Sequence, residues 1–122
     1  MKSQAYRMAM LYDFYGDLLT PRQKEFYDLY YNDDLSLSEI AENYDITRQG
    51  VRDIVVRAER ALEDIEEKTG LIRRYHRTRA AVSSLRELCQ QVQTLNEERF
   101  SDHDLEDLTQ QMNAVLDDME RE

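Results

Sequence analysis

Two arginines and a glutamine lie close together within the stretch SLSEIAENYDITRQGVRDIV, which spans residues 36–55. On a helix that begins in this stretch, Arg48, Gln49 and Arg52 would lie on the solvent side of the first turns. An arginine can donate two hydrogen bonds to a guanine, and a glutamine can pair in a similar way with an adenine. These residue types at this spacing therefore predict hydrogen bonding to base edges in a nucleic-acid groove.

Hydroxyl groups and two further arginines around the same stretch favour contacts to phosphate. Ser36, Ser38 and Thr47 can bind phosphate through their hydroxyls and through nearby backbone N–H groups. Arg57 and Arg60 follow further along and can reach the nucleic-acid backbone. The alternative interpretation is that all of these polar residues form a solvated helix surface that has no ligand.

The elements that must position these residues are two short helices joined by a tight turn. Ser36 with Glu39 forms the capping-box pattern that opens the first helix, and Thr47 is a suitable N-cap for the second. Ala41 supplies the small residue that two closely crossing helices need. Asp45 stands where the turn usually has glycine, and aspartate tolerates the left-handed backbone better than most residues. The pattern predicts a helix-turn-helix, which presents the N-terminal end of its second helix to base edges, although the same geometry also occurs as packing alone.

Helical periodicity continues on both sides of this motif. A first helix is predicted over residues 5–16, and Thr20, Pro21 and Gln23 predict the capped start of a second helix. The helix that follows the turn is long, with a stop signal at residues 69–70. The apolar residues at helical spacing in and after the first helix are Tyr6, Met10, Leu11, Phe14, Tyr15 and Leu18.

The C-terminal half is predicted to consist of two further helices. One spans residues 71–99, and Ser101 is predicted to cap the other. In the last helix apolar residues recur at steps of three and four, a heptad pattern of only about two repeats. One short chain has little with which to cover this seam, so a homodimer is predicted. The seam consists of Leu105, Leu108, Met112, Val115 and Met119.

These elements predict an all-α fold without winged elements. A helix-turn-helix domain is expected over residues 1–70, and a helical extension for dimerisation or partner docking over residues 71–122. The formal net charge is -10, which opposes binding to a polyanion. The acids concentrate in residues 97–122, however, whereas residues 47–60 carry more arginines than acids. Because salt screens exposed charges beyond about 8 Å, nucleic-acid binding is compatible with this composition if the acidic segment points away.

Residues 73–79, RRYHRTR, form a second basic segment for which three interpretations stay open. It can be a solvated surface whose arginines pair with acids of the last helix, within one chain or across a dimer. It can contact an RNA or DNA backbone, with Tyr75 and His76 as stacking surfaces. It can also be a dock for an acidic protein. Its arginines are Arg73, Arg74, Arg77 and Arg79.

The sequence lacks the signals that mark several other classes of protein. A single cysteine, Cys89, excludes an internal disulfide framework, and its place on an apolar helix stripe predicts a buried thiol. His76 and His103 lack the spacing of metal ligands, and no phosphate-binding loop or nucleophile motif indicates a cofactor or an enzyme. No apolar run approaches the ~18 residues of a membrane span. Since no signal peptide is apparent either, we expect a cytoplasmic protein.

The segment DFYGDLLTPRQKEFYDLYYNDDLSLSEIAENYDITRQGVRDIVVRAERALEDIEEKTGL closely resembles the YlxM family, small bacterial helix-turn-helix proteins. The pieces DLYYNDDLSLSEIA and ITRQGV, followed by RAE and LEDIEEKTGL, are the most specific part of the resemblance. The core, TPRQKEF…SLSEIAENYDITRQGV, is also similar to region 4 of sigma factors, where it would be the promoter-reading unit. The resemblance to YlxM proteins implies an all-helical fold and a dimer.

The same resemblance implies a regulator or component of the signal recognition particle pathway, because genes of this family lie beside those of the particle. The particle's GTPase protein and its small RNA become candidate partners. Two hypotheses stay open. In the first, a nucleic-acid-binding regulatory protein reads or anchors its target through Arg48, Gln49 and Arg52. In the second, an adaptor that does not bind DNA docks on the GTPase or the RNA through residues 73–79 and the C-terminal helices.

Overall fold

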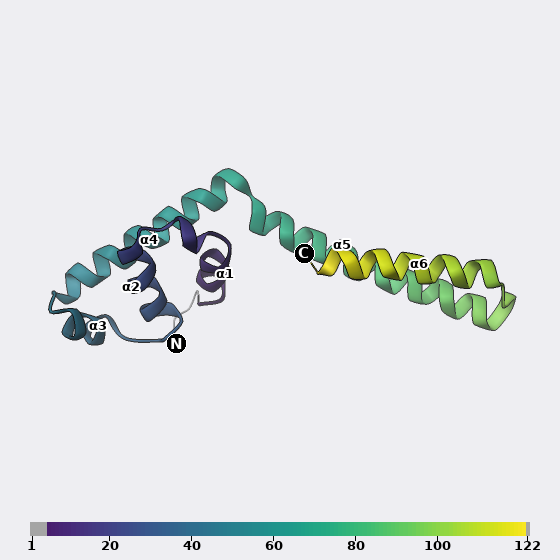
Figure 1. Ribbon diagram of the computed structural model, residues 1–122, viewed down its shortest axis with the longest axis horizontal. Coiled ribbons are helices and arrows are strands. Elements are labelled where there is room, and N and C mark those ends of the chain that lie inside the picture. Colours follow the sequence, from purple (N-terminus) through teal and green to yellow (C-terminus); the bar gives the residue numbers. More distant parts are fainter. Residues whose placement is uncertain (1–4, 122) are drawn as a thin grey trace. The chain divides into compact units, whose positions relative to one another are not determined.

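The computed structural model describes residues 5–121, and the regular secondary structure in this range is entirely helical (Figure 1). This confirms the predicted all-α class. The chain divides into two compact units, one ending at Ile72 and the other beginning at Arg73. The elements in chain order are α1 (Ala5–Tyr15), the 3₁₀ turn η1 (Gly16–Leu18), α2 (Pro21–Tyr31), α3 (Leu37–Tyr44), α4 (Arg48–Thr69), α5 (Leu71–Leu95), the π-helical turn η2 (Asn96–Phe100) and α6 (His103–Glu120).

The starts of α2 and α3 follow from local side-chain hydrogen bonds. Thr20 Oγ1 accepts from the N–H of Gln23, and the Gln23 side chain accepts from the N–H of Thr20, both at 3.2 Å. Ser36 and Glu39 form the same reciprocal pair at 3.0 and 3.1 Å. Each pair satisfies two backbone donors that a helix start would otherwise leave open. Both predicted capping boxes are therefore confirmed.

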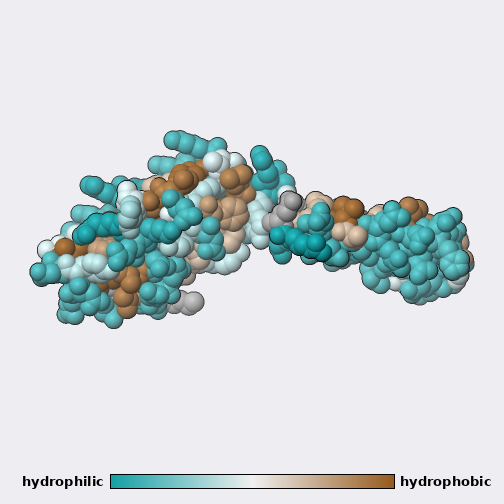
Figure 2. Space-filling view, viewed as in Figure 1, coloured by the Kyte–Doolittle hydropathy of each residue, from teal (hydrophilic) through white to brown (hydrophobic). Residues whose placement is uncertain are grey.

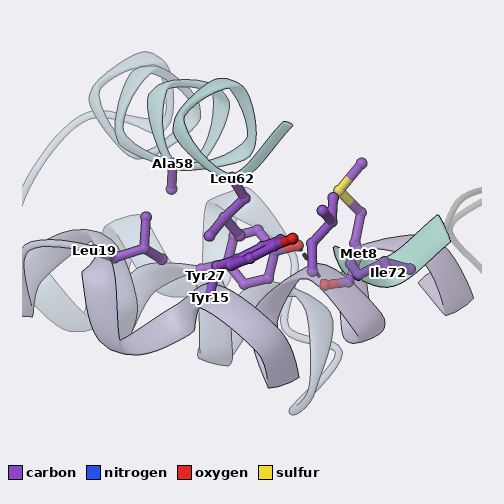
Figure 3. Close-up of a cluster of buried hydrophobic side chains, with 8 residues drawn as sticks. Met8, Tyr15, Leu19, Tyr27, Ala58, Leu62 and Ile72 are labelled. Atoms are coloured by element: carbon purple, nitrogen blue, oxygen red, sulfur yellow. Dashed lines mark hydrogen bonds between the residues drawn. The ribbon is translucent and has the colours of Figure 1, made fainter. Parts of the chain in front are cut away.

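The long helix α4 is the element around which the N-terminal unit packs. Its C-terminal half carries Ala58 and Leu62 into a cluster with α1 and α2, part of which Figure 3 shows. Its N-terminal half carries Val51 and Val55 into a second cluster with α2 and α3. Because one helix belongs to both clusters, the position of its first turns is fixed by the whole unit. The first cluster contains Met8, Leu11, Tyr15, Leu19, Tyr27, Ala58, Leu62 and Ile72, and the second contains Phe26, Ile40, Ala41, Val51 and Val55.

Helix α4 ends where the sequence predicted, at a glycine in the left-handed conformation. Gly70 has a φ of 62°, and its N–H donates to the carbonyl oxygen of Glu66 at 2.8 Å. The buried Glu66 carboxylate also accepts from the Tyr15 hydroxyl at 2.6 Å and from the N–H of Ile72 at 3.0 Å. One carboxylate thus connects α1, the end of α4 and the first turn of α5 by hydrogen bonds.

In the second unit, α5 and α6 form an antiparallel helical hairpin (Figure 1). Its buried hydrophobic cluster consists of Val82, Cys89 and Leu116, so the predicted burial of Cys89 is confirmed. Arg86 joins the two helices, because its Nη2 donates to Asp117 Oδ1 at 2.6 Å and its Nε donates to Glu120 Oε1 at 2.9 Å.

Two expectations about the helical faces and ends differ from the structure. Ser101 is not the cap of α6, because it takes a left-handed conformation at the end of η2. Asp102 is the cap, and its Oδ1 accepts from the N–H groups of Asp104 at 2.7 Å and Leu105 at 3.3 Å. The cap prediction was wrong because the chain needs one more residue to leave the preceding π-helical turn. In the first helical segment, Met8, Leu11 and Tyr15 are buried, whereas Tyr6, Phe14 and Leu18 are exposed.

Candidate nucleic-acid interface

The turn between α3 and α4 has the geometry that a helix-turn-helix needs. Asp45 lies in the left-handed region, with φ 54° and ψ 45°, and its N–H donates to the carbonyl oxygen of Ala41. The N–H of Ile46 donates to the same oxygen at 3.2 Å. Ala41 and Ile40 pack against Val51 of α4 in one buried cluster. The turn and this close contact set the direction in which α4 leaves α3.

The first turns of α4 present Arg48, Gln49 and Arg52 to solvent. Val51 lies between them in sequence and is fully buried, so the exposed side of the helix is determined by its packing. Gln49 Nε2 donates to Asp53 Oδ1 at 3.1 Å. This bond holds the amide on the outer surface, and the amide oxygen keeps its lone pairs for a donor such as the adenine amino group.

The predicted phosphate-binding hydroxyls are all exposed, and two of them already cap helices. Thr47 Oγ1 accepts from the N–H of Gly50 at 2.9 Å, and Ser36 Oγ accepts from the N–H of Glu39 at 3.0 Å. A hydroxyl that accepts in this way still has its own hydrogen to donate to a phosphate oxygen. Ser38 lies in the first turn of α3 and is exposed as well.

Several acids of α4 accept hydrogen bonds from other side chains, and one of them, Glu63, is paired with a positive charge. Glu59 Oε2 accepts from the Tyr31 hydroxyl at 2.8 Å, and burial together with this hydrogen bond raises the pKa of Tyr31. Glu63 forms two bonds with Arg7 of α1, at 2.6 and 2.8 Å, and these bonds raise the pKa of Arg7. Asp53 accepts from Gln49.

Four arginines on α4 have no acidic partner among residues 5–121. All four are exposed, and they extend from the first turn of the helix to its middle. Exposed guanidinium groups without an acidic partner can bind the phosphate oxygens of a nucleic acid. The four are Arg48, Arg52, Arg57 and Arg60.

The basic segment at residues 73–79 lies on the part of α5 that precedes the hairpin core. The guanidinium of Arg79 lies 5.5 Å from the centre of the Tyr75 ring, and Tyr75 meets His76 edge to face at 5.6 Å. Arg86, further along α5, forms ion pairs with Asp117 and Glu120 of α6. Its arginines, Arg73, Arg74, Arg77 and Arg79, are all exposed.

The described residues contain neither a cluster of metal ligands nor a helix that could span a membrane. No group of three or more His, Cys, Asp or Glu side chains between residues 5 and 121 is placed to hold a metal ion. None of the helices in this range is both long enough and apolar enough to cross a bilayer.

Sequence reasoning identified the exposed arginines but missed the partners of the acids on α4. The Arg7–Glu63 pair joins residues 56 positions apart, and the Tyr31–Glu59 pair joins residues 28 positions apart. Separations of this size carry no local pattern, so only the packed helices bring these groups together. The consequence for the site is that Glu63 is neutralised by Arg7, whereas Glu59 and Asp53 keep their negative charge beside neutral donors.

Comparison with known proteins also identifies a helix-turn-helix family. The family model UPF0122, described as "Putative helix-turn-helix protein, YlxM / p13 like", matches residues 2–103. A UPF0122 protein of Geobacillus kaustophilus is 49% identical over 87 residues, which cover 71% of this chain and 79% of the relative. UPF0122 proteins of Bacillus cereus strain AH187 and Bacillus thuringiensis subsp. konkukian are each 43% identical over 98 residues, or 80% of this chain and 89% of the relative. The match includes α3, the turn and all of α4, and the chain belongs to the UPF0122 family of YlxM-like helix-turn-helix proteins.

Proposed function

We propose that this protein is a non-enzymatic regulator that binds nucleic acid through α3, the turn and α4. The observation that carries the proposal is the set of four exposed arginines on α4, Arg48, Arg52, Arg57 and Arg60, which have no acidic partner among residues 5–121. Nucleic-acid affinity comes largely from neutralising phosphates. The cap and first part of α4, residues 47–60, carry four arginines and two acids and can supply that affinity in a chain whose formal net charge is -10, because distant acids are screened.

The roles of the residues follow from their places on the helix. Arg48, Gln49 and Arg52 lie at the end of α4 that a helix-turn-helix inserts into the major groove, where they would contact base edges. Thr47 and the α3 start, with its exposed hydroxyls, would hold the phosphates that flank the groove. Arg57 and Arg60, further along α4, would contact the phosphate backbone. The similarity to region 4 of sigma factors supports DNA as the target and α4 as its reader.

The test is binding of a fluorescent DNA duplex at low salt, measured by anisotropy. We expect Arg48→Ala combined with Arg52→Ala to weaken binding by about tenfold or more, because two phosphate- or base-binding cations are lost. Arg99→Ala, which removes an exposed arginine from η2, is the matched control and should bind like the unmodified protein. Equal binding by the double variant and the unmodified protein, with unchanged helical circular dichroism, would rule out α4 as the reader.

A second candidate function is favoured by the basic segment at residues 73–79. Its exposed arginines and the Arg79–Tyr75 contact offer both charge and a stacking surface to single-stranded or looped RNA. The resemblance to YlxM proteins makes the RNA and the GTPase of the signal recognition particle, in the cytoplasm, the partners to try first. In this case Arg74→Ala with Arg77→Ala would abolish RNA binding, whereas the double variant on α4 would not change it.

A further inference from the structure

An acid lies in the middle of the outer surface of α4. Gln49 and Asp53 each precede a buried valine of this helix by two residues, and two residues turn a helix through roughly 200°, to about the opposite side. Both side chains are exposed, at the end of the N-terminal unit where Figure 2 shows hydrophilic side chains over α3 and the start of α4. Arg48 and Arg52 precede them by one residue and therefore lie to one side of this line. A groove that receives the outer surface of α4 thus meets Asp53 as well as Gln49.

The negative charge of Asp53 is not neutralised by a neighbouring cation. Its Oδ1 accepts from Gln49 Nε2 at 3.1 Å, and this amide is neutral. No arginine or lysine between residues 5 and 121 forms an ion pair with the carboxylate. A carboxylate directed into a groove repels the phosphates on both sides and weakens binding to every sequence. A group that lowers the general affinity in this way can still improve the choice between sequences.

The same hydrogen bond fixes the direction of the Gln49 amide. A carboxylate only accepts hydrogen bonds, so it holds the NH₂ group of the amide and repels the amide oxygen. Asp53 uses one of the two N–H donors, which leaves the other N–H and the oxygen for a ligand. Adenine presents an acceptor, N7, beside the N6 amino donor in the major groove, and this pair matches the open donor and acceptor of the amide. Guanine presents two acceptors at these places, and the fixed amide oxygen would face one of them.

We propose that Asp53 makes α4 selective for adenine, as a positioning residue that holds the Gln49 amide in the orientation that pairs with this base. This selectivity rests on the proposed function, binding of nucleic acid by α4, and adds to it the base that α4 selects. At an adenine, two hydrogen bonds to Gln49 offset the repulsion between Asp53 and the phosphates. At other bases the repulsion remains without that gain, so the two side chains discriminate by attraction and by repulsion together.

A purely structural role for this hydrogen bond leads to a different expectation. A glutamine and an aspartate four residues apart stabilise a helix slightly. Loss of such a contact would change the stability of α4, but it would not change the base that the helix selects. Base preference at the position that Gln49 contacts therefore separates a positioning role of Asp53 from a structural one.

The first experiment selects bound duplexes at low salt from a DNA pool with a randomised centre and sequences them. The position whose preference disappears in Gln49→Ala is the one that Gln49 contacts. We expect adenine at this position, preferred by about tenfold or more in the unmodified protein. Asp53→Ala should lose most of this preference at the same position. Asp53→Asn should keep it, because the new amide oxygen still accepts from Gln49 Nε2.

The second experiment measures anisotropy with a fluorescent duplex that lacks the preferred adenine. Asp53→Ala and Asp53→Asn should both bind this duplex more tightly than the unmodified protein, by about twofold or more, because each removes a negative charge near the phosphates. Asp64→Ala is the matched control, since it removes an exposed acid that lies roughly 16 Å further along α4. It should change neither the affinity nor the base preference. Unchanged affinity in both Asp53 variants would show that the carboxylate does not face the phosphates.

The possible results distinguish failure of this selectivity from failure of the proposed function. If Asp53→Ala keeps the full preference, or if Gln49 contacts a base other than adenine, Asp53 does not position the amide, although α4 binds DNA. Binding of the pool without any base preference has the same meaning. If the unmodified protein retains no duplex of any sequence, the proposed function is wrong and the selectivity falls with it. Circular dichroism of each variant checks that its helix content is unchanged.

Discussion

Asp45 lies in the left-handed conformation in the turn between α3 and α4, and this turn contributes to the direction of the candidate reading helix. Its φ of 54° and ψ of 45° lie in the region that favours glycine. An ordinary L-residue there costs about 1 to 2 kcal/mol, and aspartate somewhat less. The turn therefore contains a local strain that the contacts of Ala41 and Val51 offset.

Substitution of Asp45 measures this strain. Asp45→Gly should raise the free energy of unfolding by about 0.5 kcal/mol, because glycine adopts the left-handed region without a steric penalty. Asp45→Ala should lower it by about 1 kcal/mol, since alanine has neither the freedom of glycine nor the local hydrogen bonding of aspartate. Urea unfolding followed by circular dichroism gives both values. If the Asp45→Ala variant has the same free energy of unfolding as the Asp45→Gly variant, strain in the turn does not affect stability.

Among single residues, a helix cap could be predicted from the sequence where the capping side chain and the backbone N–H that it accepts from are three residues apart. Thr20, Ser36 and Thr47 cap helices as their sequence neighbours indicated. At the start of α6 two adjacent residues could serve, and the structure uses Asp102 rather than Ser101. The choice depends on how the preceding turn ends: the Asn96 side chain holds the backbone of Asp102 through two bonds, at 2.8 and 2.9 Å. No local pattern describes that turn.

At the scale of elements, α1 is fixed against α2 by a buried phenol. The Tyr27 hydroxyl donates to the carbonyl oxygen of Met8 at 2.6 Å, and both residues belong to the cluster that also contains Leu62 of α4. Burial raises the pKa of Tyr27, so the hydroxyl keeps its proton at physiological pH. Removal of this hydroxyl would leave the carbonyl of Met8 without that donor inside the core.

Tyr27→Phe should therefore lower the free energy of unfolding by about 1 to 2 kcal/mol. Tyr44→Phe is the control, because the Tyr44 hydroxyl donates to Glu25 on the exposed surface and should contribute less. Both variants are compared by chemical denaturation. If the two losses are equal, the buried bond to Met8 is no more important than a surface bond.

The pairing of α5 with α6 should depend on pH through Glu120. The hydrogen bond from Arg86 lowers the pKa of the Glu120 carboxyl below its ordinary value of 4.5. A lowered pKa means that the stabilisation is present above the unfolded value and is lost as pH falls through the folded value. We expect carbon-13 NMR titration to show a low pKa for Glu120, and Arg86→Gln to return it toward the ordinary value. An unshifted carboxyl in the unmodified protein would contradict this contact.

The heptad pattern of α6 was visible in the sequence, but the surface that contacts α5 was not. Leu116 is buried in the hairpin, whereas Leu108, Met112 and Val115 of the predicted seam are exposed. Periodicity shows that an apolar face exists and does not show which of two neighbouring stripes meets the partner helix. Thr109 of α6 is buried as well, and its hydroxyl is satisfied by donating to the carbonyl oxygens of Leu105 and Glu106.

At the scale of the whole molecule, the distribution of charge matters more than its sum. The formal net charge is -10, but acids crowd residues 97–122 while unpaired arginines lie along α4. Composition alone predicts poor binding to a polyanion. The order of the residues along the sequence, however, already shows that arginines gather in the first part of α4 and acids in the C-terminal segment. The pairing of Glu59 and Glu63 with other helices was not predictable, because it depends on the packed unit.

Salt dependence of DNA binding tests this division of charge. Each arginine that neutralises a phosphate contributes about 0.9 to the slope of log affinity against log salt concentration. Arg57→Ala with Arg60→Ala should therefore reduce the slope by about 2 and weaken binding equally on different sequences. Anisotropy measured over a range of salt concentrations gives the slope. An unchanged slope would show that the middle of α4 does not touch the backbone.

The most direct test of the central claim is an NMR titration of the isotopically labelled chain with duplex DNA at low salt. Reading by α4 predicts that the largest amide shift changes fall in residues 47–60 and at the start of α3. Changes confined to residues 73–122, or the absence of any change at saturating DNA, would contradict the assignment of α4 as the nucleic-acid-binding helix.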